Sequence, residues 1–372
     1  MAMVMLLVDI TDFEEEDEEV LQLRITRKRL RDELNVFNLP DIQFKNLFRV
    51  SKDLVRDLVT ELRPHLQRER PNGLSVETQV LCAIRFYAVG SYQRAIGQDF
   101  ALALSQTAVS RCIRSVSVAI NDHMLRRWIK FPATPEQREA AKIKFANAPQ
   151  PFPGAIGAID CTHVGIVAPK ENEEAFVNHH GYHSMNVQMI CDPELRILNV
   201  SARFPGSRHD AAIWMQSPVR NLMELCHRQG ERQTWLLGDS GYPLEPWLLT
   251  PIPNAPNGSP AYVYTAAHCS ARSVIERCFG ALKSVWRCLS HQRLLMYEPD
   301  MAGRIINAGA MLHNMRLHYR IPFEEIAEED VAQANAMPAP GPYIAEPLEG
   351  RARLAEGRRV QQQLIRDNFM HL

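Results

Sequence analysis

A proline-rich stretch, Pro149-Gln-Pro-Phe-Pro-Gly154, divides the sequence into two parts with different periodicities. Proline removes a backbone donor and clashes with the preceding turn, so no helix can continue through this stretch. Before it, apolar residues recur at helical spacing, whereas short apolar runs typical of buried strands follow it. We therefore expect a helical domain over 21–150 and an α/β domain over 155–320. The length of 372 residues is sufficient for about two domains, each with its own core.

Charge is segregated along the chain, although the net charge is only −1. Residues 1–20 carry eight acids and no Lys or Arg, which is typical of a flexible lead-in. Residues 21–150 carry 22 bases and 12 acids. This block could neutralise DNA phosphates, or it could be a set of solvated helix faces. Residues 321–372 are acidic and contain several prolines, so we expect a tail that ends in one helix near 351–370.

The ends of the chain and its cysteines exclude several classes of protein. Met1 to Val8 is apolar but too short to span a bilayer, and acids rather than a basic flank follow it. We therefore expect neither a membrane segment nor a secretory signal. The eight cysteines are scattered without CxxC spacing, which gives little support to zinc and favours reduced thiols in the cytosol or nucleus.

The basic block contains a helix-turn-helix pattern. A helix is predicted to begin after Ser75 and to stop at Gly90, a short segment follows, and Ser105 is a predicted N-cap for a longer helix to Asn121. On this plan Arg111 and Arg114 belong to the exposed face of the second helix, which could lie in a DNA major groove. Three packed helices without a ligand are the structural alternative.

Two apolar runs end alike, Ala155-Ile-Gly-Ala-Ile-Asp160 and Trp235-Leu-Leu-Gly-Asp239. Each places an aspartate at the carboxyl end of a predicted buried strand, where open α/β sheets bind their ligands. If the two strands are parallel neighbours, the two carboxylates meet and repel each other unless a divalent cation such as Mg²⁺ lies between them. The alternative is that each aspartate caps the turn that follows its strand.

Two further acids could complete such a site. Glu276 is predicted near the start of a helix over 271–289, where a helical wheel places it opposite the apolar face together with Gly280 and Lys283. A surface pair with Arg272, four residues earlier, is the alternative for this glutamate. Asp210 follows His209 and could be a metal ligand, a partner of a ligand, or the first residue of a helix.

Five ordered blocks carry a resemblance to a known family, and they cover about residues 155–316. The blocks are Gly157-Ala-Ile-Asp-Cys-Thr-His163, Pro205-Gly-Ser-Arg-His-Asp-Ala211, Leu237-Gly-Asp-Ser-Gly-Tyr242, Val274-Ile-Glu-Arg-Cys-Phe-Gly280 and Ala281-Leu-Lys-Ser-Val-Trp-Arg-Cys-Leu289. In these blocks the sequence resembles the PIF/Harbinger superfamily of DDE transposases. The first block of the family often has glycine where this chain has Cys161.

The resemblance implies an α/β fold with a ribonuclease-H-like catalytic domain, a mixed sheet flanked by helices, after the all-α helix-turn-helix-like domain. It implies the catalytic triad Asp160, Asp239 and Glu276, with Asp210 as a further candidate metal ligand. It also implies a Myb/SANT-like partner protein that supplies DNA binding and nuclear import. We expect the chain in the nucleus and the cytoplasm.

We therefore predict a nuclease that hydrolyses DNA phosphodiester bonds with two divalent cations, Mg²⁺ or Mn²⁺. Arg272 and Lys283 could contact DNA phosphates, or they could be helix-surface charges. The main alternative function is a DNA-binding or scaffolding protein that keeps the transposase fold without cutting. A second alternative is a metal hydrolase that acts on small phosphate esters through His209 and Asp210.

Overall fold

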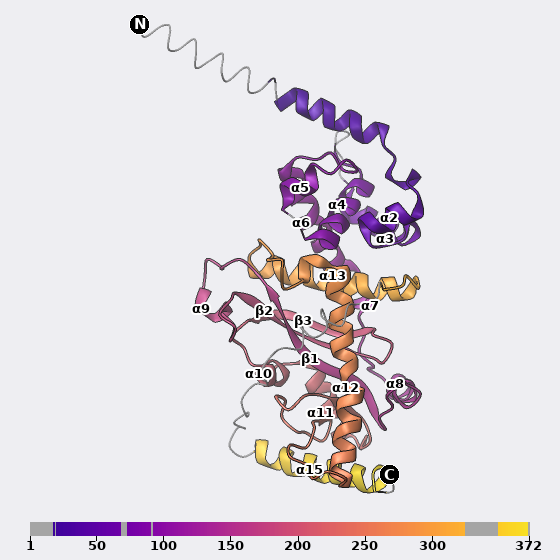
Figure 1. Ribbon diagram of the computed structural model, residues 1–372, viewed down its shortest axis with the longest axis vertical. Helices are drawn as coiled ribbons and strands as arrows, with labels where there is room; N and C mark the ends of the chain where they lie inside the picture. Colours follow the sequence, from indigo (N-terminus) through magenta and orange to yellow (C-terminus); the bar gives the residue numbers. More distant parts are fainter. Residues whose placement is uncertain (1–17, 19, 68–72, 91, 324–348, 371–372) are drawn as a thin grey trace. The chain divides into compact units, whose positions relative to one another are not determined.

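The computed structural model describes residues 18, 20–67, 73–90, 92–323 and 349–370 (Figure 1). The chain forms two compact units, 1–116 and 117–372, which are described separately below. Within the described ranges, no helix has the length and apolar character needed to cross a bilayer. Residues 1–17 of the predicted lead-in and 324–348 of the predicted tail lie outside the described residues.

The first unit is helical. Residues 20–33 form a helix. The elements that follow are η1 (Val36–Asn38), α2 (Asp41–Phe48), α3 (Lys52–Leu66), α4 (Val76–Val89), α5 (Gln93–Gly97) and the beginning of α6 (Gln106–His123).

Capping residues set the helix ends that the sequence predicts. The Ser75 hydroxyl accepts the Thr78 N–H at 3.1 Å, and Gly90 ends α4 in the left-handed conformation, φ +63°. The Ser105 hydroxyl accepts the Ala108 N–H at 3.2 Å at the start of α6. The pattern of a helix, a short helix and a longer helix is therefore present.

The division between the two units falls within α6. The predicted domain limits, 21–150 and 155–320, stay a prediction. Two helices that this prediction assigned to the first domain, α7 (Leu125–Trp128) and α8 (Pro135–Ala146), contact α13 and β1 of the second unit. Their packing groups them with the sheet, although they precede the proline-rich stretch.

A five-stranded mixed sheet forms the centre of the second unit, with the strand order β3-β2-β1-β4-β5. The strands are β1 (Ala155–Gly165), β2 (Ser184–Cys191), β3 (Ile197–Pro205), β4 (Trp235–Leu237) and β5 (Leu248–Leu249). β1, β2 and β3 pair antiparallel, whereas β4 runs parallel to β1 and β5 runs parallel to β4. The predicted hairpin around Asp192-Pro-Glu-Leu is confirmed, because Asp192 Oδ1 accepts the N–H groups of Glu194 and Arg196 across the turn.

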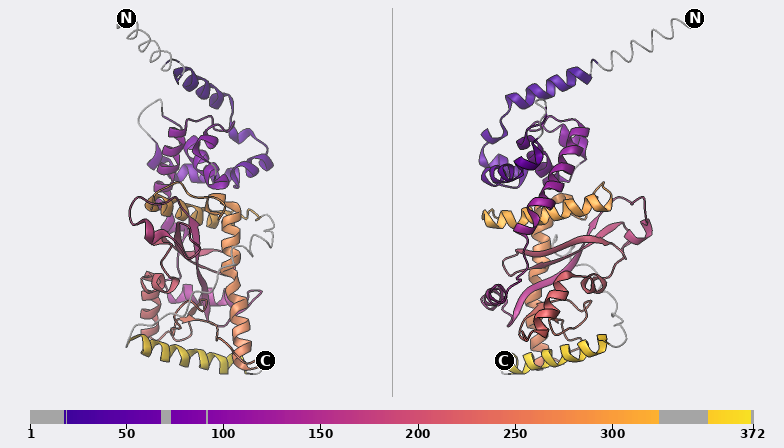
Figure 2. Two further views of the ribbon diagram at one scale, coloured as in Figure 1. Left: turned by 60° about the vertical axis from the view of Figure 1, so that its left-hand side comes forward. Right: turned by 180° about the vertical axis from the view of Figure 1, so that it is seen from behind.

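Helices cover both faces of this sheet (Figure 2). Among the described residues after β1, the helical elements are α9 (Glu173–Phe176), α10 (Asp210–Met215), α11 (Pro218–Arg228), α12 (Pro260–Val285), η2 (Arg287–Leu289), α13 (Pro299–His318) and α15 (Glu349–Asn368). Buried residues of α10 and α11 form one core with Ile156, Ile159 and Leu236. Buried residues of α12 and α15 form another core with Ala155, Trp235 and Leu237. Residues 155–159 of β1 and the whole of β4 are therefore buried on both faces, as their apolar sequence runs indicate.

Two predicted boundaries are wrong. β1 does not end at Asp160 but continues to Gly165, because β2 pairs with it from Ala158 to Gly165. Helix α12 begins at Pro260, 11 residues before the predicted start, because Ser259 caps it and proline is well tolerated at the first helical position. Glu276 therefore lies deep inside α12 rather than near its start.

Candidate active site

Asp160 and Asp239 occupy matched positions on two parallel neighbours. Ala158 of β1 is the register partner of Leu237 of β4. Asp160 lies two residues after Ala158, and Asp239 lies two residues after Leu237. β4 ends at Leu237, so β1 loses its parallel neighbour just before Asp160. The predicted meeting of two parallel strand segments is therefore confirmed, although Asp160 is an internal residue of β1.

The Asp160 carboxylate is mostly buried and has two donors. Its Oδ1 accepts the Cys161 N–H at 2.8 Å, and its Oδ2 accepts Arg272 Nη1 at 2.9 Å. Burial raises the pKa of Asp160 to about 8, and the nearby charges of Asp239 and Asp210 add to this rise while Arg272 opposes it. Burial therefore disfavours the ionised form of Asp160 unless a further cation compensates its charge.

Asp239 is fixed by the short turn that follows β4. Its Oδ1 accepts the Gly241 N–H at 2.9 Å. Burial raises the pKa of Asp239, Arg272 and the turn's N–H groups lower it, and the charge of Glu276 raises it further. The two strand aspartates and the helix glutamate therefore lie close enough to influence one another's ionisation.

Arg272 joins Asp160 of the sheet to Glu276 of α12. Its guanidinium bonds Asp160 through Nη1 and Glu276 Oε1 through Nη2. Only 17% of the Arg272 side chain and 24% of the Glu276 side chain is exposed, so the pair is not the exposed surface pair that the spacing suggests. The helical wheel predicts that this face of α12 is exposed to solvent, but in the structure it points towards β1.

Asp210 approaches the same carboxylates from the first turn of α10. Its Oδ1 accepts Asn186 Nδ2 at 2.9 Å, and the same amide donates to the Arg208 carbonyl at 2.8 Å. Burial raises the pKa of Asp210, Asn186 lowers it, and the charge of Asp239 raises it. Asp210 is thus both the first residue of a helix and a neighbour of the other acids.

Lys283 lies two turns beyond Glu276 on α12, and its ammonium is occupied by β1. Nζ donates to Thr162 Oγ1 at 2.7 Å and to the His163 carbonyl at 3.0 Å. Burial lowers the pKa of Lys283 to about 8. These bonds hold α12 against the strand that carries Asp160, and the predicted contact of Lys283 with DNA phosphate stays a prediction.

Polar residues of β2 form a part of the site that the sequence reasoning missed. Asn186 and Gln188 are buried within an otherwise apolar strand. Gln188 Nε2 donates to Tyr242 Oη at 3.3 Å, and Tyr242 Oη lies 3.4 Å from Cys161 Sγ. The sequence signal for this part of the site was a pair of amide side chains, two residues apart on a predicted buried strand. Buried amides need hydrogen-bonding partners, so such a pair indicates a buried polar site.

The histidines near the end of β1 make hydrogen bonds and ring contacts. His163 Nδ1 lies 2.9 Å from Ser184 Oγ, and His183 Nε2 lies 3.0 Å from Glu173 Oε1. The ring centroids of His179 and His180 are 3.9 Å apart. Burial lowers the pKa of His163 to about 3, so this ring is neutral at physiological pH.

The donor set suits a hard divalent cation, but the carboxylates are not closed around one point. Carboxylate oxygens are the ligands that Mg²⁺ and Mn²⁺ prefer, and here several buried carboxylates share a single arginine. Among the residues that the structure describes, no three Asp, Glu, His or Cys side chains are grouped as a metal site. Arg272 lies between Asp160 and Glu276 instead.

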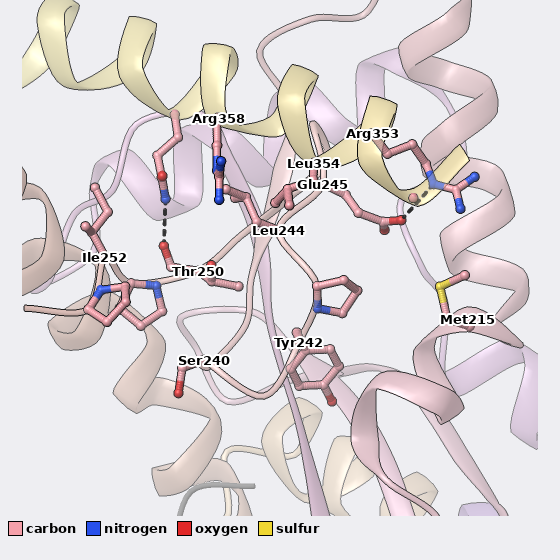
Figure 3. A pocket seen from close by; sticks show the side chains of 15 residues that line it. Met215, Ser240, Tyr242, Leu244, Glu245, Thr250, Ile252, Arg353, Leu354 and Arg358 are labelled. Carbon is pink, nitrogen blue, oxygen red and sulfur yellow. Dashed lines mark hydrogen bonds and ion pairs between the residues drawn. The ribbon is translucent and has the colours of Figure 1, made fainter. Parts of the chain in front are cut away.

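A pocket of about 480 Å³ begins at the residue after Asp239 (Figure 3). Ser240, Tyr242 and Leu244 line it from the segment after β4, while Arg353 and Arg358 line it from α15. Arg353 Nε lies 3.8 Å from the buried Glu245 carboxylate. The pocket thus lies between the segment that follows β4 and helix α15.

The predicted DNA-contacting residues of the first unit lie on α6. Arg111 and Arg114 are exposed, as are Gln106 and Thr107 at the start of the helix, while Val109 and Ile113 are buried on the opposite side. The exposed side of α6 is thus the side that the wheel predicts.

Asp160, Asp210, Asp239 and Glu276 together are called the acidic edge below. Comparison with known proteins connects this acidic edge to a family. Residues 159–314 match the family described as DDE superfamily endonuclease. The chain is 32% identical over 332 residues to "Putative nuclease HARBI1" of Homo sapiens, covering 86% of this chain and 93% of that protein. The Xenopus laevis protein of the same name is 32% identical over 345 residues, 92% of this chain and 94% of that protein. "Protein ALP1-like" of Arabidopsis thaliana is 28% identical over 293 residues, 73% of this chain and 70% of that protein.

No solved structure matches the chain. The family match begins one residue before Asp160 and spans Asp210, Asp239 and Glu276, so it includes all the acids that the fold brings to the edge of the sheet. The relatives align over nearly the whole length of both proteins. The predicted resemblance is confirmed, and the chain belongs to the Harbinger transposase-derived nucleases of the DDE superfamily.

Proposed function

We propose that this chain is a divalent-metal-dependent endonuclease that hydrolyses DNA phosphodiester bonds at the acidic edge of its sheet. The observation that carries the proposal is the matched placement of Asp160 and Asp239 beyond the parallel pair Ala158 and Leu237, with Glu276 reaching them from α12. Elements far apart in the sequence supply these acids. An aspartate whose only role was to cap the turn after its strand would not need to lie near the other two acids.

The strand arrangement supports a ribonuclease-H-like catalytic domain. In the strand order β3-β2-β1-β4-β5, three antiparallel strands are followed by two parallel strands. β1 and β4 are therefore neighbours near the centre of the sheet. Asp160 within β1 and Asp239 after β4 share one edge of the sheet. Helix α12 then crosses the same sheet and supplies the glutamate.

Asp160, Asp239 and Glu276, with Asp210 as a further ligand, would hold two Mg²⁺ or Mn²⁺ ions. Such ions, when bound, activate a water or a 3′-hydroxyl and stabilise the leaving oxygen of an in-line displacement. The protein's own contribution is to orient the acids before substrate arrives. The Cys161 N–H fixes Asp160, the Gly241 N–H fixes Asp239, and the Asn186 amide fixes Asp210.

We also propose that the first unit binds DNA through α6, with Arg111 and Arg114 at phosphates or base edges. The basic charge of residues 21–150 and the exposure of both arginines support this role. Replacing both with alanine should weaken DNA binding and reduce the salt slope by about 2, because each phosphate contact contributes ~0.9. An unchanged slope in a binding titration would leave α6 a structural helix.

Membership of the family further supports a Myb/SANT-like partner protein and a distribution between nucleus and cytoplasm. Co-precipitation of tagged chain with such a partner, and imaging of the chain with and without it, test these two proposals. If the chain enters the nucleus without this partner, the proposed role of the partner in nuclear import is contradicted.

Nicking of supercoiled DNA tests the catalytic proposal. The parent should convert supercoiled to open-circular DNA in Mg²⁺ or Mn²⁺ and stop in EDTA. Asp239→Asn removes one proposed ligand, so nicking should fall by more than ~100-fold. Loss of a residue that only holds a metal ligand in place typically costs up to about 100-fold, and loss of the ligand itself should cost more. Asp300→Asn is the control, because Asp300 is exposed in the first turn of α13.

A parent that binds DNA but nicks it under no divalent metal would favour the non-cutting, scaffolding alternative. Hydrolysis of a small phosphate ester that survives Asp239→Asn would favour the hydrolase alternative through His209 and Asp210. Neither result is compatible with the proposed endonuclease.

A further inference from the structure

The guanidinium of Arg272 occupies the space between the carboxylates of the acidic edge. It bonds Asp160 at 2.9 Å and Glu276 at the same time, and the charge of Asp239 acts on it as well. Its side chain is 17% exposed, as is that of Asp160. A single monovalent cation is therefore enclosed by several acids.

The acids at this edge carry more negative charge than the Arg272 guanidinium can neutralise. Asp160, Asp239, Asp210 and Glu276 act on one another electrostatically, and Arg272 is the cation that acts on three of them. The nearby Lys283 ammonium is bonded to Thr162 Oγ1 and to the His163 carbonyl. The remaining negative charge makes the edge a better place for a divalent cation than for an arginine.

The side chain of Arg272 can move while its helix stays in place. Its helix neighbours Ala271, Val274 and Ile275 are buried in the core of the second unit, so α12 is held in place. The long, unbranched arginine side chain can rotate about its own bonds while the helix stays fixed. Asp160 and Asp239 remain oriented by backbone N–H groups when the arginine leaves.

We propose that Arg272 is a built-in counter-ion that takes the place of a divalent cation in the metal-free protein. This inference rests on the proposed metal site. Arg272 keeps the acids together before a cation binds, and its guanidinium leaves Asp160 and Glu276 when one does. The released guanidinium lies next to the site, where its planar fork fits a DNA phosphate.

Arg272 thereby couples the two binding events. A cation competes with the guanidinium for the carboxylates, and a phosphate offers the displaced guanidinium a new partner. Because coupling between two ligands is reciprocal, DNA should strengthen cation binding and a cation should strengthen DNA binding. Loss of Arg272 should change the two affinities in opposite directions.

Titration calorimetry with Mn²⁺ on the full chain tests the proposal. Arg272→Gln should bind Mn²⁺ about tenfold more tightly than the parent, because no guanidinium has to be displaced; this corresponds to ~1.4 kcal/mol. The same variant should bind duplex DNA less tightly than the parent in Mn²⁺. Arg277→Gln is the matched control on the same helix, since Arg277 contacts Ser273 and Gln150, and its Mn²⁺ affinity should equal that of the parent.

Arg272→Lys keeps the charge but cannot hold two carboxylates with one planar fork. Its Mn²⁺ affinity should lie between those of the parent and Arg272→Gln, and it carries the test if the glutamine variant does not fold. Equal Mn²⁺ affinity of the parent and the folded variants would overturn the counter-ion role while leaving the metal site intact. Absence of Mn²⁺ binding by the parent and by every folded variant would overturn the metal site and, with it, this inference.

Discussion

Two clusters of arginine and carboxylate lie buried in the second unit, and their charge balance differs. At one, the Glu245 carboxylate accepts Trp214 Nε1 at 2.8 Å and Arg220 Nη2 at 2.6 Å, with Arg353 Nε at 3.8 Å. At the other, Arg272 alone serves Asp160 and Glu276, with Asp239 and Asp210 close by. In the first cluster two arginines lie beside one carboxylate, whereas in the second one arginine bonds two carboxylates.

This difference separates a cluster that holds the fold from one that awaits a ligand. Glu245 joins the turn before β5 to α10, α11 and α15, and it is buried to 2% exposure. Its partners are complete without any added group. Asp160, Asp210 and Asp239 keep raised pKa values even with the arginine in place, so a further cation would stabilise their ionised forms.

The same substitution in the two clusters should therefore have different effects on stability. Arg220→Gln leaves the buried Glu245 without its main partner and should cost about 3–5 kcal/mol. For a unit of this size the Tm should fall by roughly 2–4 °C per kcal/mol. Arg272→Gln should cost less, because Asp160 takes up a proton when its cation is lost. Differential scanning calorimetry in EDTA measures both, and equal losses would remove the distinction between the clusters.

Asn186→Ala should weaken catalysis without a large loss of stability. The amide orients Asp210 and the Arg208 carbonyl, and partners of this kind typically contribute 10–100-fold to metal affinity or activity, so we expect about tenfold slower nicking. Asn199→Ala on β3 is the control, since Asn199 pairs with Ile190 of the same sheet and lies in none of the site's hydrogen bonds described above. Unchanged nicking by Asn186→Ala would place Asp210 outside the functional cluster.

The pH dependence of stability gives a smaller effect that is specific to the acidic edge. The folded pKa of Asp160, about 8, lies above its ordinary value of 3.8, so folding takes up a proton between these limits. The stability of the metal-free protein should fall as pH rises from about 4 to about 8 and then level off. Asp160→Asn should remove part of this slope, shifting the Tm by about 2–4 °C at pH 8 for each kcal/mol.

Thermal denaturation in EDTA at pH 5 to 8 measures this slope. Saturating Mg²⁺ should flatten the curve of the parent, because a bound cation favours the ionised carboxylates, and should leave Asp160→Asn nearly unchanged. Asp300→Asn serves as the exposed control. Parallel curves for the parent and Asp160→Asn would mean that Asp160 is ionised in the folded protein over this range.

Much of the acidic edge could be predicted because the determinants are local. A buried strand needs a continuous apolar run, and such a run that stops at an aspartate marks where the strand meets solvent or ligand. Asp160 and Asp239 were found in this way, and the parallel pairing of β1 with β4 agrees with it. The hairpin after β2 was likewise visible, because Asp192 and the proline after it define a turn.

The remaining features depend on contacts that no local pattern carries. β1 continues past Asp160 because β2 pairs along its polar half. A helical wheel assigned Glu276 and Lys283 to a solvent face, whereas Lys283 bonds β1 and Glu276 is joined to β1 through Arg272. The bridge from Arg272 to Asp160 joins residues 112 positions apart, so the spacing to Glu276 alone could suggest only a helix pair.

Crystallography of the full chain with Mn²⁺ tests the central claim most directly, because the anomalous signal locates the ion. We expect anomalous density between Asp160 and Asp239, with the Arg272 guanidinium turned away from Asp160 and Glu276. Density at some other site, with Arg272 still joining those two carboxylates at saturating Mn²⁺, would contradict the account.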